Sequence, residues 1–178
     1  GVSGFASLTL QVVWTRLLAQ ILGPTTYAFS TVVAIFIIGI AVGAAIGSRL
    51  AGRAKNPAAG LACSLLVSAG LALAAASGVD WALLTIGEIV SRPEYQFADV
   101  LGREVLLVSA LLLPMTVAFG AAFPFAVAVA SGRDDTVTEH HGRIYAINSL
   151  GAILGALLAG FVLIPAVGLH LTIRAVAA

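Results

Sequence analysis

The chain has 178 residues, of which 60% are hydrophobic and only 10% are charged, and its mean hydropathy is +1.08. An ordinary soluble domain carries about 25% charged residues, and a water-exposed globule of this size could not hide so much apolar surface. The composition therefore excludes a soluble enzyme, a nucleic-acid-binding domain and a disordered tail. It predicts an integral membrane protein, and the net charge of +1 offers no broad attraction to nucleic acid.

Five stretches are long and apolar enough to cross a bilayer, which needs about 20 residues. Gly23-Pro24 divides the first long apolar stretch into two. The predicted spans lie at about 2–22, 27–50, 57–79, 104–131 and 144–168. The sequence thus predicts an all-α, polytopic helical bundle that forms a single transmembrane domain over residues 1–178.

The segment 80–103 is too polar to be a span. Its apolar part, 81–90, is short, and its apolar side chains share one helical face. With Trp81 and Tyr95 as interfacial aromatic residues, this pattern predicts a short helix in the headgroup layer. The alternative is a sixth span formed by bending 81–90 into the bilayer, which would require Glu88 to be paired inside the bundle.

Basic residues in short loops mark the cytoplasmic face of a membrane protein. Arg49, Arg53 and Lys55 cluster in the turn after the second span without an acid, whereas 80–104 carries an excess of acids. We therefore expect the amino terminus and this turn to be cytoplasmic, in a bacterial inner membrane. A sixth span would reverse the orientation of everything that follows it.

Small residues at four-residue spacing predict close helix packing, because helix association in lipid depends on close backbone approach. Gly39, Gly43 and Gly47 form such a groove on the second span, and Gly151 and Gly155 form one on the fifth. We expect tight packing within one bundle. The alternative is a sliding surface between the two halves of a transporter.

Three polar residues inside the predicted spans are candidates for function, because intramembrane polar groups are costly and normally face the bundle interior. Gln11 and Arg16 lie on the first span, and Asn148 lies one turn into the fifth. We expect Asn148 to hydrogen-bond a neighbouring helix and Arg16 to pair with an acid of 80–104. A ligand or lipid-phosphate contact is the alternative for Arg16.

Nothing in the sequence points to catalysis, since no Gly-rich nucleotide loop and no pair of acids within a span is present. Adjacent helical residues point about 100° apart, so Glu139, His140 and His141 do not make a convincing metal site. We expect no catalytic residue, no metal and no cofactor. The single cysteine, Cys63, is expected to be a small buried side chain.

Three stretches together resemble the membrane domain of fused spermidine synthase-like proteins. They are LQVVWTRLLAQILGPTTYAFSTVVAIFIIGIAVGAAIGSRLAGR (10–53), LPMTVAFGAAFPF (113–125) and GRIYAINSLGAILGALLAGFVLIPAVGL (142–169). In that family a helical region of the major facilitator type precedes a soluble aminopropyltransferase-like domain, so the resemblance implies part of a major facilitator half. The chain departs from the family at Gln11, where the fused proteins commonly carry glutamate. Its turn at 47–53 is also similar to the cytoplasmic turn after the second helix of major facilitators, but it lacks the aspartate that those proteins usually carry near Ala51 or Gly52. The resemblance carries over no catalytic residue, because those belong to the soluble domain.

These observations predict a non-catalytic membrane scaffold or anchoring subunit that packs in the lipid bilayer against other membrane subunits or a soluble domain. One alternative is half of a secondary transporter for polyamines or small cations, which would need a second half. Another is the membrane part of an aminopropyltransferase-like enzyme whose soluble domain lies outside this chain. A transporter predicts a cavity lined by Gln11, Arg16 or Asn148, whereas a scaffold predicts that neighbouring helices satisfy these groups.

Overall fold

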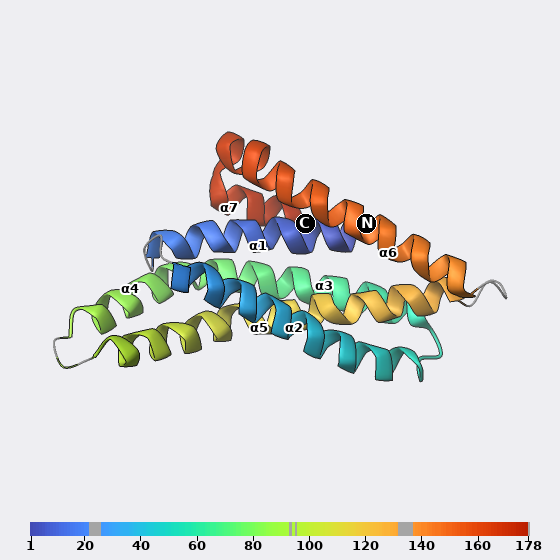
Figure 1. The fold of residues 1–178 in the computed structure, drawn as a ribbon, viewed down its shortest axis with the longest axis horizontal. Helices are drawn as coiled ribbons and strands as arrows, with labels where there is room; N and C mark the ends of the chain where they lie inside the picture. The colour runs from blue at the N-terminus through green and yellow to red at the C-terminus, as the bar shows by residue number, and fades with distance from the viewer. Residues whose placement is uncertain (22–25, 93, 95, 132–136, 178) are drawn as a thin grey trace.

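The computed structural model describes residues 1–21, 26–92, 94, 96–131 and 137–177. Every element in this part of the chain is helical, and the long helices pack lengthwise (Figure 1). The predicted all-α bundle is therefore confirmed. The elements are α1 (Val2–Ile21), α2 (Thr26–Ala51), α3 (Pro57–Ser77), α4 (Val79–Val90), α5 (Phe97–Ser131), α6 (Val137–Leu158), the π-helical turn η1 (Ala159–Leu163) and α7 (Ile164–Ala177).

Five of the described helical stretches are long and apolar enough to cross a bilayer. Each overlaps one predicted span, and α4, with twelve residues, is not among them. The chain is thus a membrane protein whose described residues contain five candidate spans. These lie at Val2–Ala19, Phe29–Ala51, Pro57–Ser77, Phe97–Ala130 and Gly142–Leu169.

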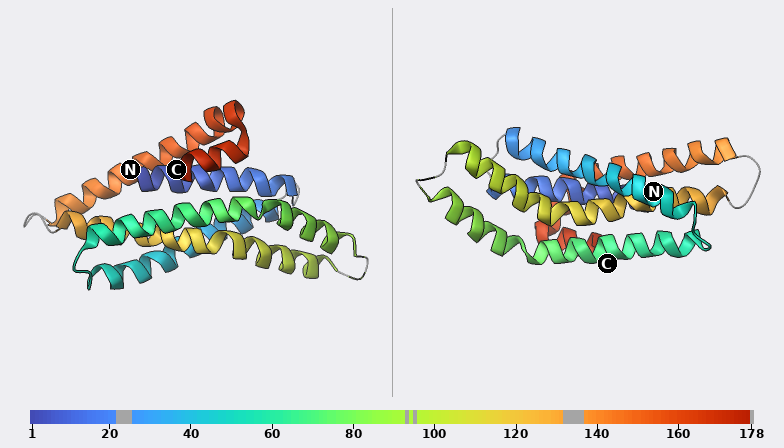
Figure 2. Two further views of the ribbon diagram at one scale, coloured as in Figure 1. Left: turned by 180° about the vertical axis from the view of Figure 1, so that it is seen from behind. Right: turned by 90° about the horizontal axis from the view of Figure 1, so that it is seen from below.

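Much of the polar segment 80–103 is helical. α4 follows α3 after Gly78, and α5 begins at Phe97, earlier than the predicted start of the span near 104. The 35 residues of α5 would extend roughly 52 Å at 1.5 Å per residue, well beyond a hydrocarbon core of about 30 Å. Accordingly, α4 and the first turns of α5 form a hairpin that projects past the end of the bundle (Figures 1 and 2).

The last predicted span ends in a reversal of the chain. α6 continues through η1 into α7, where Gly168 has φ 81° and ψ 173°. Only glycine adopts such a positive φ without strain, so the helix path breaks there. Beyond Gly168 the chain turns back along α1 and α3 (Figure 1), and Thr172 and Ile173 are fully buried. The span was predicted to end at 168, but this returning segment was not predicted.

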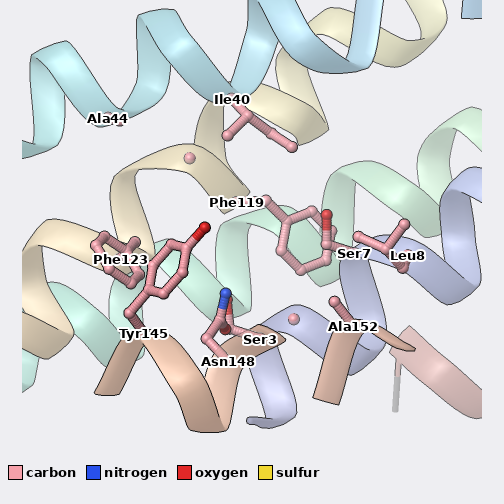
Figure 3. A pocket seen from close by; sticks show the side chains of 12 residues that line it. Ser3, Ser7, Leu8, Ile40, Ala44, Phe119, Phe123, Tyr145, Asn148 and Ala152 are labelled. Atoms are coloured by element: carbon pink, nitrogen blue, oxygen red, sulfur yellow. The ribbon is translucent and has the colours of Figure 1, made fainter. Parts of the chain in front are cut away.

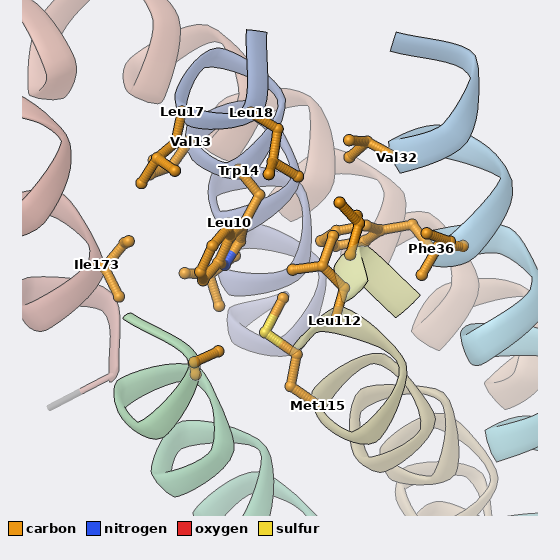
Figure 4. Packing of buried hydrophobic residues seen from close by; sticks show 14 of the residues in the cluster. Leu10, Val13, Trp14, Leu17, Leu18, Val32, Phe36, Leu112, Met115 and Ile173 are labelled. Atoms are coloured by element: carbon orange, nitrogen blue, oxygen red, sulfur yellow. The ribbon is translucent and has the colours of Figure 1, made fainter. Parts of the chain in front are cut away.

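The hydrophobic core is centred on α1. Trp14 is fully buried, and its indole N–H has no hydrogen-bond partner among the described residues. Around it gather side chains from α2, α5 and α7, so α1 is enclosed by several helices (Figure 4). Besides Trp14, the largest fully buried side chains of this core, on α1 and on the helices around it, are Leu10, Leu18, Phe36, Leu112, Met115 and Ile173.

Both predicted glycine grooves receive the backbone of a neighbouring helix. A Cβ added at Gly43 on α2 would overlap the carbonyl of Val117 on α5, and Gly39 and Gly47 face the same helix. On α6, a Cβ at Gly155 would overlap the carbonyl of Phe5, and Gly151 likewise lies against the start of α1. In each case the residue numbers increase together along the contact, so α2–α5 and α1–α6 are parallel pairs.

Replacing a groove glycine should therefore destabilise the bundle. We expect Gly43→Ala to lower the free energy of unfolding by about 1–3 kcal/mol, because the added methyl group meets backbone that cannot move aside. Unfolding by sodium dodecyl sulfate in mixed micelles measures this change.

The matched control is Gly70→Ala on α3, where an added Cβ meets nothing within 4 Å. It should be neutral or stabilising by up to about 1 kcal/mol, since alanine is the better helix former. Equal effects of the two substitutions would contradict the packing described above.

Candidate functional site

A cavity of about 250 Å³ lies where the two parallel helix pairs meet. Its walls come from α1, α2, α5 and α6 (Figure 3). Most of the lining is apolar, and no charged side chain is among the described lining residues. The aromatic and polar side chains that line it are Ser3, Ser7, Phe119, Phe123, Tyr145 and Asn148.

Ser7 presents an unusual hydroxyl to this cavity. The residue is 7% exposed, and the hydroxyl makes no hydrogen bond within the described part of the chain. Most helical hydroxyls in the bundle instead donate to a carbonyl one turn earlier, as Thr15 does to Gln11 at 2.8 Å and Ser68 to Leu65 at 2.8 Å. The hydroxyl of Ser7 is therefore free to donate to, or accept from, a molecule in the cavity.

Asn148 lies in the same cavity beside Tyr145. Their polar ends point into one space, across from Phe119 (Figure 3). Gly4 lets α1 approach closely here, since an added Cβ would overlap the backbone carbonyl of Asn148. The expected hydrogen bond from Asn148 to a neighbouring helix is not present among the described residues, and its half-buried amide faces the cavity instead.

Pro124 interrupts the hydrogen bonding of α5 beside the cavity. Pro124 has no N–H, so it cannot donate to the carbonyl of Gly120, four residues earlier. Gly120 lines the cavity and packs closely on Ile40 of α2.

The other two predicted polar residues lie outside the cavity. Gln11 is half-buried, and its backbone carbonyl accepts a hydrogen bond from the hydroxyl of Thr15. Arg16 is exposed and makes no ion pair with an acid in the described ranges, so the expected pair with 80–104 is not formed there. Of the three candidates, only Asn148 meets the other polar groups of the cavity.

The remaining expectations concern metals and the cysteine. The described residues contain no group of three or more His, Cys, Asp or Glu side chains that could hold a metal ion. The side chains of Glu139, His140 and His141 lie outside the described residues. Cys63 is exposed on α3, so its predicted burial was wrong. In a membrane protein an apolar stretch has a lipid-facing side, and hydrophobicity alone does not indicate burial.

The two parallel pairs follow one plan. Gly4 of α1 lies against the carbonyl of Asn148 on α6, and Gly120 of α5 lies against the carbonyl of Ile40 on α2. Exchanging α1 with α5 and α6 with α2 therefore maps one contact onto the other. The same holds one turn along, with Gly151 against the carbonyl of Gly1 and Gly43 against the carbonyl of Val117.

The two helices that exchange, α2 and α6, also share a short sequence pattern. GAAIGSRLAG at 43–52 and GAILGALLAG at 151–160 share the pattern G-A-x-x-G-x-x-L-A-G. The first helix of each three-helix unit, α1–α2–α3 or α5–α6–α7, runs parallel to the second helix of the other unit. The third helices, α3 and α7, contact each other. The two units thus form an inverted repeat, and the cavity lies among the four helices that exchange.

Comparisons of the chain with protein-family models, with curated proteins and with solved structures find no match. The class is therefore defined by the fold and composition: an all-α membrane protein with five candidate spans among its described residues. Within that class, the distinguishing features are the inverted repeat and the uncharged cavity at its centre.

Two hydroxyls on α1 should differ in their effect on stability. Thr9 is fully buried and donates to the carbonyl of Gly155 on α6 at 3.2 Å. We expect Thr9→Val to lower the free energy of unfolding by about 0.5–1.5 kcal/mol, as the loss of one interhelical hydrogen bond does. Ser7→Ala should change it by less than about 0.5 kcal/mol, because that hydroxyl holds no neighbour. A loss for Ser7→Ala as large as that for Thr9→Val would mean that Ser7 has a structural partner.

Proposed function

We propose that the chain forms one half of a secondary transporter, in which the cavity among α1, α2, α5 and α6 is part of the solute path. The observation that carries this proposal is the inverted repeat with a cavity at the interface of its units. Many secondary transporters are built from inverted repeats and bind their substrates at that interface, near the bilayer midplane. The position of Asn148 in the cavity favours this function over the scaffold expected from the sequence.

The helix contacts also support a bundle with two arrangements. α1–α6 and α2–α5 meet through glycine faces, which present smooth backbone surfaces instead of interlocked side chains. Directly after this contact region, α6 passes into the π-helical turn η1, and such turns are frequent at functional sites. Gly168 then gives the chain a sharp bend at the far end of the span.

The proposed orientation follows the charges at the two ends of the bundle. Arg49, Arg53 and Lys55 lie at the end where α2 meets α3, whereas the acids of the α4–α5 hairpin lie at the opposite end (Figure 1). By the positive-inside rule, the basic end faces the cytoplasm, as does the start of α1. In this proposal the membrane is the bacterial inner membrane, and a second copy or another membrane subunit completes the transport path.

A scaffold or anchoring subunit related to the spermidine synthase-like membrane domain is the second candidate. It is favoured by an apolar outer face on α6, where large side chains remain exposed over several turns. Such a face suits packing against other membrane subunits as well as lipid. The exposed side chains are Leu150, Ile153, Leu154 and Leu157 of α6, and Phe161 of η1 continues the face.

Accessibility of the cavity separates the two candidates. In a Cys63→Ala background, Ser7→Cys places a thiol in the cavity, and Leu66→Cys places one on the 74% exposed outer face of α3. A membrane-impermeant maleimide is applied to each face of sealed vesicles of known orientation. For a transporter, we expect Ser7→Cys to react from both faces, because the solute path opens alternately, whereas Leu66→Cys, covered by lipid, resists both treatments.

Reaction of Ser7→Cys from one face only would indicate a fixed vestibule, and reaction from neither face would indicate a closed packing defect. Either result would contradict the transporter and favour the scaffold.

A further inference from the structure

We infer that the cavity binds a small uncharged molecule with an apolar body and one hydrogen-bonding end, and that it discriminates against polyamines and other cations. This inference names the substrate class of the proposed transport site and so rests on that proposed function. It replaces the polyamines or small cations that the sequence offered as substrates in the transporter alternative.

The described walls of the cavity carry no charged side chain. The polar side chains that line the cavity are two serines, a tyrosine and an asparagine, all of them neutral. A cation that enters a low-dielectric cavity without a counter-charge loses its hydration and gains no compensating partner. The acids whose side chains the structure describes lie on or around the α4–α5 hairpin, and none of them lines the cavity: Asp80, Glu88, Glu94, Asp99 and Glu104.

Three polar side chains of the cavity have unused hydrogen-bonding capacity. The side chains of Ser7, Tyr145 and Asn148 make no hydrogen bond with any residue that the structure describes. Hydroxyls and amides both donate and accept. A ligand whose polar end also does both, such as a primary amide, can therefore pair with these groups.

The two units of the inverted repeat have equivalent backbone contacts but carry different side chains at the cavity. In the exchange that relates Gly4 to Gly120, Ser3 and Ser7 of α1 occupy positions equivalent to those of Phe119 and Phe123 of α5. The position of Asn148 on α6 is likewise equivalent to that of Ile40 on α2. All six of these side chains line the cavity, so its α1–α6 wall is polar and its α2–α5 wall is apolar (Figure 3). A molecule with one polar end and one apolar end therefore fits in a single orientation.

The size of the cavity limits the ligand. Its volume of about 250 Å³ lies just below the range of roughly 300–1,000 Å³ that is usual for ligand pockets. The aromatic rings of Phe119 and Phe123 on the apolar wall suit a flat apolar body. A long flexible chain with several charges matches neither the size nor the walls.

Benzamide and benzamidinium make a discriminating pair of probes, because they have nearly the same shape and differ in charge. Equilibrium dialysis of each radiolabelled probe against the protein in nanodiscs, with empty nanodiscs subtracted, measures saturable binding. We expect saturable binding of benzamide that is at least about tenfold tighter than that of benzamidinium, and no saturable binding of spermidine.

Substitutions at Asn148 test the polar wall. Asn148→Leu should weaken benzamide binding by about tenfold, as the loss of a hydrogen bond does. Asn148→Asp should reverse the preference in favour of benzamidinium, because it supplies the missing counter-charge. Gln11→Leu removes another intramembrane amide, outside the cavity, and should leave binding unchanged. Ser7→Ala, which we expect to fold as the parent chain does, should also weaken benzamide binding.

The proposal is overturned if benzamidinium or spermidine binds as tightly as benzamide, or if no probe binds saturably. It is also overturned if Asn148→Leu and Ser7→Ala both bind benzamide as well as the parent chain. These results are independent of maleimide accessibility. Neutral-selective binding with reaction from one face would keep the site and remove transport, whereas cation-selective binding with reaction from both faces would keep transport and remove this inference.

Discussion

Close approach of backbones in parallel helix pairs is the constraint on which the rest of this structure depends. Lipid tails are as apolar as the helices themselves, so the bundle gains little from hydrophobic burial and relies on van der Waals contact and interhelical hydrogen bonds. Gly43 and Gly155 provide that contact, since each brings a neighbouring carbonyl to a distance that no side chain would allow. The positions of the cavity walls follow, because all four wall helices belong to these two pairs.

Within this tightly packed bundle, the hydrogen-bond partners of a polar side chain indicate whether it stabilises the fold or is available to a ligand. The hydroxyl of Thr9 donates to a carbonyl of the opposing helix, and that of Thr116 donates to carbonyls of its own helix. Ser7 does neither and faces the cavity, which is why we assign it to the site and not to the fold. Trp14 is a different case: its unpartnered indole N–H lies in the core, away from the lining of this cavity, where packing on all sides holds the ring in place.

The spans and the glycine grooves were predictable because they depend on local spacing, which a helix converts directly into a face. Asn148 was a candidate for the same reason, but its partner was not predictable, since that depends on which helix lies opposite. Ser3 and Ser7 were missed because serine in a helix usually satisfies itself, although their four-residue spacing places them on one face. The pairing of 43–52 with 151–160 becomes meaningful only when the contacts show which helices exchange. Cys63 shows the converse limit, because an apolar environment in the sequence is compatible with the lipid-facing surface.

In the transport site that we propose, a repeat whose backbone is symmetric and whose side chains are not separates two requirements. The backbone relation gives α1–α6 and α2–α5 equivalent packing, so a shift of one pair has a counterpart of similar cost in the other. The side chains do not follow that relation, because the positions of Asn148 and Ser7 correspond to Ile40 and Phe123. A molecule held by its polar end would therefore stay with the α1–α6 pair while the apolar α2–α5 wall moves past it. In this proposal, side chains that differ on a two-fold-related backbone give a bound solute one orientation without disturbing the packing of the two helix pairs.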